Sequence, residues 1–190
     1  MRAVVVFESM FGNTQKIADA VAEGLSGYVD TDLVEVGSAG GLDEGVALVV
    51  AGGPTHVHGL SRPGTRDGAV KQAPHGVVSK GIGLREWLES LPQARGIVSA
   101  AAFDTRFDKP GWLVGSAARG AARRLRRRGY RLIVPPESFF VVAASSGPLA
   151  DGEVERARRW GKALGAAVAP ADRGRQVSYP TSADGRHAWR

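Results

Sequence analysis

Apolar residues along this chain form short runs that alternate with longer amphipathic stretches. Three nearly continuous apolar runs predict strands that are covered on both faces, at residues 2–8, 46–52 and 96–103. Residues 28–36 alternate between apolar and polar positions, which predicts a more exposed, peripheral strand. A last strand is predicted over 130–143, and we expect an interruption at Pro135 and Pro136 because proline lacks the N–H that a sheet needs.

Helical periodicity separates these runs. It predicts helices at residues 13–26, 83–91, 112–128 and 151–168. The first helix carries its inward stripe at Ile17, Ala20, Val21, Gly24 and Leu25. In the last helix Asp151 is the expected N-cap, and the residues expected to face inward are Val154, Ala157, Trp160 and Leu164.

Strands that alternate with helices predict an α/β fold. The expected architecture is a doubly wound, five-stranded parallel sheet with right-handed crossovers and a helical layer on each face. The connection at 37–45 is too short for a good helix. We assign residues 1–170 to one domain and interpret 171–190 as a flexible tail, because that stretch is rich in Pro, Gly, Ser and charge and has no periodicity.

The composition fits one domain in a reducing compartment. A chain of 190 residues with 43% hydrophobic content can bury one sizeable core. The absence of cysteine excludes disulfides and thiolate metal sites. The apolar run near the start is too short for a signal peptide, and no stretch approaches a membrane span. We therefore expect a cytoplasmic protein with no membrane partner.

The formal net charge is +6, and much of the excess comes from one arginine cluster. Its members are Arg119, Arg123, Arg124, Arg126, Arg127, Arg128 and Arg131. No aromatic interleaving or nucleic-acid motif accompanies them, so we interpret the cluster as the solvated face of a helix that stops at Gly129, with no nucleic-acid partner. Docking of an acidic protein is the alternative that remains.

Ligands of doubly wound sheets bind beyond the carboxyl ends of the strands. The segments that follow buried strands, and therefore meet at that edge, are 8–14, 53–66 and 103–116. The first segment places small and polar residues at a helix start: Ser9, Gly12, Asn13 and Thr14. Backbone N–H groups and the helix dipole favour a phosphate there, although an ordinary helix start would have the same composition. The segment matches neither G-x-G-x-x-G nor G-x-x-x-x-G-K-[ST], which disfavours dinucleotide and P-loop sites.

This first segment resembles the phosphate loop of the flavodoxin-like family, and "GGPTHVHG" at 52–59 resembles the P-T-x-x-x-G loop that supports the flavin ring. The resemblance covers roughly residues 2–168 in element order. It implies a sheet of order 2-1-3-4-5, bound flavin mononucleotide (FMN) and electron transfer. It assigns cofactor binding to Ser9, Met10, Phe11, Gly12, Asn13, Thr14, Pro54, Thr55, His56, Val57, His58, Gly59, Phe103, Asp104, Thr105 and Arg106.

The chain departs from the family pattern at its aromatic positions. Phe11 stands where many flavodoxins carry another hydroxyl, and the second loop offers Val57 and two histidines in place of a stacking tryptophan. The third loop supplies the candidates for stacking: Phe103, Phe107 and Trp112. His56 and His58 lack a third ligand placed by the sequence, so we assign no metal. Two interpretations of this pair remain. In the first, one histidine hydrogen-bonds the flavin ring or a substrate; in the second, both histidines are partly exposed loop residues.

Basic residues separate this chain from acidic flavodoxins. The cations expected near the flavin are Arg62, Arg66, Arg106 and Lys109. Because positive charge favours the reduced anionic flavin, we predict a higher reduction potential than that of acidic flavodoxins. Because the protein as a whole is basic, we also predict a redox partner with an acidic docking face. We favour an electron carrier. The alternatives are an NAD(P)H-dependent oxidoreductase acting on quinone-like or other small acceptors, with 56–82 forming or covering a pocket, and a cofactor-free interaction module that uses the arginine helix.

Overall fold

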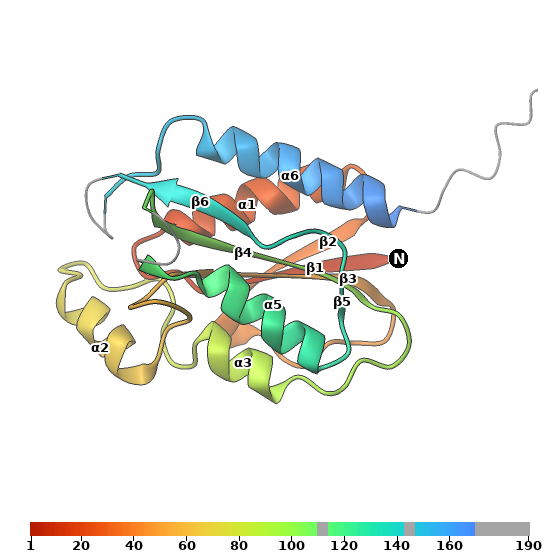
Figure 1. Cartoon of the computed structure of the whole chain (residues 1–190), viewed down its shortest axis with the longest axis horizontal. Helices are drawn as coiled ribbons and strands as arrows, with labels where there is room; N and C mark the ends of the chain where they lie inside the picture. Colours follow the sequence, from red (N-terminus) through yellow and green to blue (C-terminus); the bar gives the residue numbers. More distant parts are fainter. Residues whose placement is uncertain (110–113, 143–146, 170–190) are drawn as a thin grey trace, which may run out of the picture.

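The chain forms a parallel six-stranded sheet (Figure 1), seen in a computed structural model that describes residues 1–109, 114–142 and 147–169. The strands are β1 (Arg2–Phe7), β2 (Asp30–Glu35), β3 (Val46–Pro54), β4 (Ser99–Phe107), β5 (Arg131–Leu132) and β6 (Glu137–Val141). Their order is β2-β1-β3-β4-β5, and β6 also pairs with β4. The predicted order 2-1-3-4-5 is therefore confirmed.

The predicted last strand is interrupted as expected. β5 pairs with the start of β4, through Ser99 and Ala100, and β6 pairs with the other end of β4, from Phe103 onward. Pro135 and Pro136 separate the two pieces. The sixth strand is thus the second half of a strand that prolines divide.

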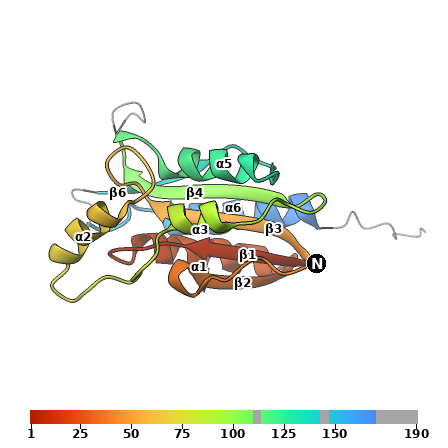
Figure 2. The same cartoon turned by 90° about the horizontal axis from the view of Figure 1, so that it is seen from below.

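Helices cover both faces of the sheet. Helices α1 (Asn13–Ser26) and α6 (Glu153–Val168) lie on one face, and α3 (Leu84–Ser90) and α5 (Ala117–Arg127) lie on the other (Figure 1). A single 3₁₀ turn, η1 (Val36–Ser38), follows β2. Helix α2 (Pro63–Lys71) projects beyond the carboxyl ends of the strands, which Figure 2 shows from below. The doubly wound architecture is confirmed.

Two details of the last helix differ from the prediction. Its N-cap is Gly152, with φ of +79°, rather than Asp151. Val154 is exposed, because the neighbouring Glu153 takes the inward position and its carboxylate accepts a hydrogen bond of 2.7 Å from the backbone N–H of Phe140. In the first turn of α6, a polar residue that hydrogen-bonds β6 therefore takes the inward position that the apolar pattern assigned to Val154.

The strands divide their side chains between two apolar layers. Val4 and Val6 face the layer that contains α3 and α5, whereas Val5 and Phe7 face the layer that contains α1 and α6. The same alternation continues to the carboxyl ends of the strands. It decides which residues of the following loops can reach a ligand there.

Some predictions concern residues outside the described ranges, namely Trp112 and the tail at 171–190. The domain boundary at residue 170 stays a prediction for the same reason. Among the described residues, no helix combines the length and the apolar character needed to cross a membrane.

Candidate functional site

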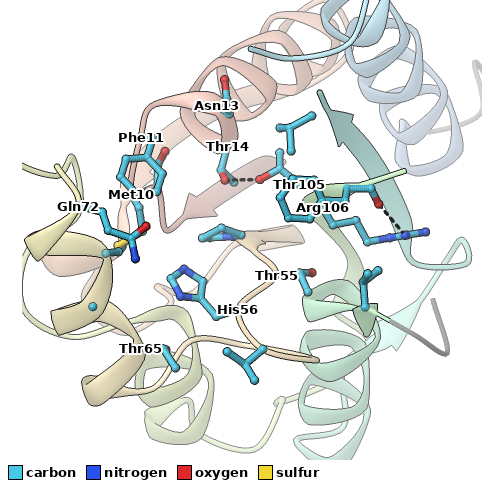
Figure 3. Close-up of a pocket in the computed structure, with 18 of the residues that line it drawn as sticks. Met10, Phe11, Asn13, Thr14, Thr55, His56, Thr65, Gln72, Thr105 and Arg106 are labelled. Carbon is cyan, nitrogen blue, oxygen red and sulfur yellow. Dashed lines mark hydrogen bonds between the residues drawn. The ribbon is translucent and has the colours of Figure 1, made fainter. Parts of the chain in front are cut away.

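The three predicted loops meet at the carboxyl edge of the sheet and border a cavity of about 550 Å³ (Figure 3). Most of the residues assigned from the sequence line it: Ser9, Met10, Phe11, Asn13, Thr14, Pro54, Thr55, His56, Val57, His58, Thr105 and Arg106. The assigned residues that do not line it are Gly12, Gly59, Phe103 and Asp104. A cavity of this size accommodates a ligand of nucleotide dimensions.

The loop after β1 leaves the N-terminus of α1 open. The N-cap residue is Gly12, with φ of +88°, and no side chain among the described residues caps the helix. Ser9 and Thr14 are buried, and the Ser9 hydroxyl accepts a hydrogen bond of 3.1 Å from the Gly12 N–H. Backbone N–H groups at an uncapped helix start are available to an anion.

Hydrogen bonds fix this loop against its neighbours. The hydroxyls of Thr14 and Thr105 lie 2.7 Å apart and share a hydrogen bond, drawn as a dashed line in Figure 3. On the other side, the Ser9 N–H donates to the Ser79 hydroxyl at 2.9 Å. These two contacts hold the loop in a defined position.

The second loop has a strained backbone. Val57 and His58 have φ of +32° and +71°, a region that non-glycine residues seldom occupy. His56 and Gly59 close the loop by exchanging backbone hydrogen bonds of 2.8 and 2.9 Å. Gly115 packs behind it, since a Cβ at that position would overlap the His58 backbone. Such strain persists only where the surrounding structure enforces it, as at many ligand sites.

Asp104, which the sequence assigned to cofactor binding, is fully buried and does not line the cavity. Its buried Oδ2 accepts hydrogen bonds from the Thr55 hydroxyl at 3.1 Å, the Ser116 hydroxyl at 2.7 Å and the Ala118 N–H at 2.9 Å. One carboxylate oxygen thus joins the second loop to the start of α5. Asp104 is a positioning residue for Thr55.

Phe103 also differs from its assignment, because it belongs to the core. It is fully buried, and its ring packs edge-to-face on Phe139 and Trp160, with ring centroids 6.0 and 6.1 Å away. Strand alternation points it toward α1 and α6 and away from the cavity. Phe11 and Phe107 are the aromatic residues that line the cavity within the described ranges.

Arg106 lines the cavity, but its guanidinium is held at β6. It donates to the Ser138 hydroxyl at 3.0 Å and to the carbonyls of Phe107 and Lys109, at 3.0 and 2.6 Å. Arg66, another cation expected near the flavin, lies outside the lining and pairs with Glu86 at 3.1 Å. The positive charge at the cavity is smaller than the sequence implied.

His56 points its imidazole into the cavity (Figure 3). Burial, followed by the positive charge of Arg66, lowers the pKa of His56 below its ordinary 6.5, against an opposing backbone hydrogen bond with Thr65. The ring is therefore neutral at pH 7 and can donate or accept one hydrogen bond. Within the described part of the chain, no three His, Cys, Asp or Glu side chains are arranged to hold a metal.

A further wall of the cavity comes from α2, which lies within the segment 56–82 that the sequence offers as forming or covering a pocket in an oxidoreductase. Neither this helix nor its lining residues are predicted from the sequence. Helix α2 contributes Thr65, Gly68, Ala69 and the residue that follows the helix, Gln72. Ala69 packs with Met10 and Val77 in a small apolar cluster. Pro63 at the first helical position is a local signal for this helix start. Val114 and Val141 complete the set of missed lining residues.

Solved structures share this arrangement of strands and helices. A flavodoxin from the domain Archaea superposes with a TM-score of 0.61 at 20% sequence identity, covering 88% of this chain and 99% of that chain. Flavodoxin 1 from Bacillus cereus gives 0.59 at 17% identity, covering 88% and 98%. This chain has a flavodoxin-like fold. The flavodiiron protein from Giardia intestinalis gives 0.54 at 19% identity, covering 89% of this chain and 38% of that chain.

No family model matches the chain, and no curated protein matches its sequence. At these identities the similarity establishes the flavodoxin-like fold alone.

Glu8, the residue after β1, is a buried carboxyl beside the first loop of this flavodoxin-like domain. Its Oε2 accepts a hydrogen bond of 2.8 Å from the Leu84 N–H, whereas Oε1 has no hydrogen-bond partner among the described residues. Burial raises the pKa of Glu8 above 4.5, against opposing contributions from Ser61, Leu84 and Arg66. At pH values between 4.5 and the raised pKa of the folded state, the folded protein therefore holds a proton that the unfolded chain has released.

We predict that Glu8 makes folding stability fall as pH rises. The window begins near 4.5, the ordinary pKa of a glutamate, and extends up to the raised pKa of the folded state. Within it the slope is at most about 1.4 kcal/mol per pH unit for one proton. Glu8→Gln is expected to flatten this dependence in urea unfolding measured at a series of pH values from 4.5 upward. Glu44→Gln, at an exposed glutamate, is the control; equal slopes in both variants would contradict the assignment.

Proposed function

We propose that the protein binds FMN in this cavity and transfers electrons. The observation that carries the proposal is the N-terminus of α1, where the N-cap residue Gly12 has no capping side chain and the flanking residues Ser9 and Thr14 line a nucleotide-sized cavity. A phosphate would neutralise the helix dipole and accept from the free N–H groups. The flavodoxin-like fold supports this location, because ligands of doubly wound sheets bind beyond the carboxyl ends of the strands.

The residues present fit each part of FMN. Thr14 and Thr105 share one hydrogen bond, so one of the two hydroxyls keeps a proton that it can donate to a phosphate. Val57 and His58 in the second loop, with Phe11 on the other side, would border the flavin ring. Bound FMN supplies the redox chemistry. The chain supplies binding, orientation and a neutral hydrogen-bonding imidazole at His56.

An absorbance spectrum of the purified protein tests this proposal. It is recorded before and after addition of FMN, with free flavin removed by gel filtration. Flavin bands that elute with the protein support FMN binding. A colourless protein that retains no FMN would overturn the proposal and leave the cofactor-free interaction module as the better reading.

An NAD(P)H-dependent oxidoreductase is the second candidate. The observation that favours it is α2, which adds Thr65, Gly68 and Gln72 to the cavity wall beside the second loop and would shelter a small acceptor from water. Rapid oxidation of NADPH or NADH by the FMN-loaded protein alone would identify the enzyme. Absence of that reaction favours the carrier, for which the net charge of +6 supports a partner with an acidic docking face.

The charge distribution supports a reduction potential above that of acidic flavodoxins. None of the described residues that line the cavity is Asp or Glu, whereas Arg106 does line it and its Nε lies 3.9 Å from the carboxylate of the buried Asp104. We predict that Arg106→Gln lowers the two-electron midpoint potential by roughly 20 to 40 mV, equivalent to about 1 to 2 kcal/mol. Arg106→Lys keeps the charge and is expected to keep the potential. Potentiometric titration of the loaded proteins is the measurement, and a midpoint that is unchanged in Arg106→Gln contradicts the electrostatic argument.

A further inference from the structure

A second cavity, of about 370 Å³, lies directly behind the second loop. It is bordered by that loop, by the start of α3 and by α5, which lie on the same face of the sheet (Figure 1). Val57 and His58 line both this cavity and the one proposed for FMN. We call this space the arginine cavity, because five arginines line it: Arg62, Arg85, Arg123, Arg124 and Arg127.

The positive charge of the arginine cavity is largely unbalanced. No Asp or Glu lines it within the described ranges. Arg124 pairs with Glu89 at 3.0 Å, outside the lining. Arg85 is oriented by two backbone carbonyls, those of Leu60 at 2.8 Å and Ser61 at 2.9 Å, which leave its full charge in place. The side chains of Arg62, Arg123 and Arg127 form no ion pair with any described residue.

Like charges crowd one another in this cavity. Burial, and then the positive charges of Arg124 and Arg62, lower the pKa of Arg85, against the opposing charges of Glu89 and Glu86. This repulsion opposes folding in the absence of an anion, so an anion with several charges would relieve it. The guanidinium groups present paired N–H donors, which match the oxygens of a phosphate in a bidentate arrangement.

The shape of the cavity favours a small ligand. A concave space of this volume accommodates a phosphate or diphosphate group. Val57 is 71% exposed at the ridge between the two cavities. A molecule anchored by its phosphates among the arginines would extend over this ridge toward the proposed flavin site.

We propose that the arginine cavity binds the phosphate groups of a small organic molecule and holds that molecule beside the Val57–His58 ridge. The phosphate could belong to a nicotinamide dinucleotide or to a phosphorylated acceptor, which share this chemistry. Binding itself is independent of the proposed function. The role of the ligand as a redox substrate rests on the proposed FMN site.

Calorimetric titration of the full chain with inorganic pyrophosphate tests the proposal. The titration is run with FMN present in excess, so that a phosphate site at α1 is already filled. Arg123→Gln and Arg127→Gln are each expected to weaken pyrophosphate binding about ten-fold or more, because each removes a charge-assisted contact. Arg126→Gln is the matched control: it removes the same charge from an exposed position of the same helix that does not line the cavity. It is expected to change binding by less than about three-fold.

The outcomes separate the proposals. Absence of pyrophosphate binding, or equal weakening by Arg126→Gln, overturns the arginine cavity as a specific site. Binding of a poly-glutamate peptide without pyrophosphate binding overturns it in favour of an acidic protein. Displacement of pyrophosphate by NADPH supports the site with a dinucleotide as source, and displacement only by sugar phosphates supports it with a phosphorylated acceptor. FMN retention is read from the absorbance of the same samples, so failure of the FMN site and failure of the arginine cavity are distinguishable.

Discussion

Gly12→Asp is expected to weaken FMN binding at least about 100-fold relative to Gly12→Asn, a difference of roughly 3 kcal/mol. Gly12 is the N-cap of α1 and has φ of +88°, a conformation that Asp and Asn tolerate better than other non-glycine residues. A Cβ at this position meets nothing within 4 Å, so both side chains fit. The two variants share shape and backbone strain and differ by one negative charge at the place proposed for the phosphate.

The measurement is a fluorescence titration of FMN against each variant. Unfolding in urea accompanies it, because an acidic residue near a helix start usually stabilises the helix and should not reduce the stability of the Asp variant below that of the Asn variant. Lower FMN affinity at equal or greater stability isolates repulsion of the phosphate. Equal affinity of the two variants would place the phosphate away from α1 and remove the main support for an FMN site.

Gly161→Ala is expected to destabilise the fold by roughly 2 to 3 kcal/mol. Helices α1 and α6 cross where Gly24 and Gly161 face the opposite helix, and a Cβ on Gly161 would overlap the backbone carbonyl of Val21. The helices would have to separate along the layer that also buries Ile17 and Leu164. This cost exceeds the gain in helix propensity, about 1 kcal/mol, that alanine has over glycine.

Gly64→Ala in α2 is the matched control. Its Cβ would meet nothing within 4 Å, so the substitution is expected to leave stability unchanged or raise it by up to about 1 kcal/mol. Both variants are compared by equilibrium urea unfolding, with the denaturant slope monitored to confirm that the denatured states are comparable. An unchanged free energy of unfolding in Gly161→Ala would contradict the close packing of α6 on α1.

The sequence by itself determined the succession of strands and sheet-covering helices along the chain, without α2, and the edge at which a ligand would bind. Apolar runs such as 46–52 are too continuous for a half-exposed strand, and the helical stripes between them require a sheet covered on both faces. Parallel strands bring their carboxyl ends to one edge, so loops far apart in the sequence meet there. Prolines 135 and 136 likewise predicted the break in the last strand from local chemistry.

Only the tertiary structure decided which residues of these loops reach the cavity. In β4 the alternation of side chains sends Phe103 and Thr105 toward α1 and α6 and Asp104 toward α5. Phe103 then stops in the core, one pleat before the cavity, while Thr105 reaches it. The face of the sheet to which a side chain points depends on the register of the strand against its neighbours. That register cannot be predicted from a run of residues that are apolar on both faces.

Long side chains and distant segments were decided in the same way. Arg106 turns its guanidinium to β6 because Ser138 and two carbonyls accept from it there. Helix α2 enters the wall through the contact of Ala69 with Met10, which no periodicity in 63–71 announces. The arginine cavity arises because α5 packs beside α3 and the second loop, so arginines that the sequence placed on a solvated helix face converge with Arg62 and Arg85. Local patterns fix which residues form an element, whereas convergence of charges from separate elements is a property of packing alone.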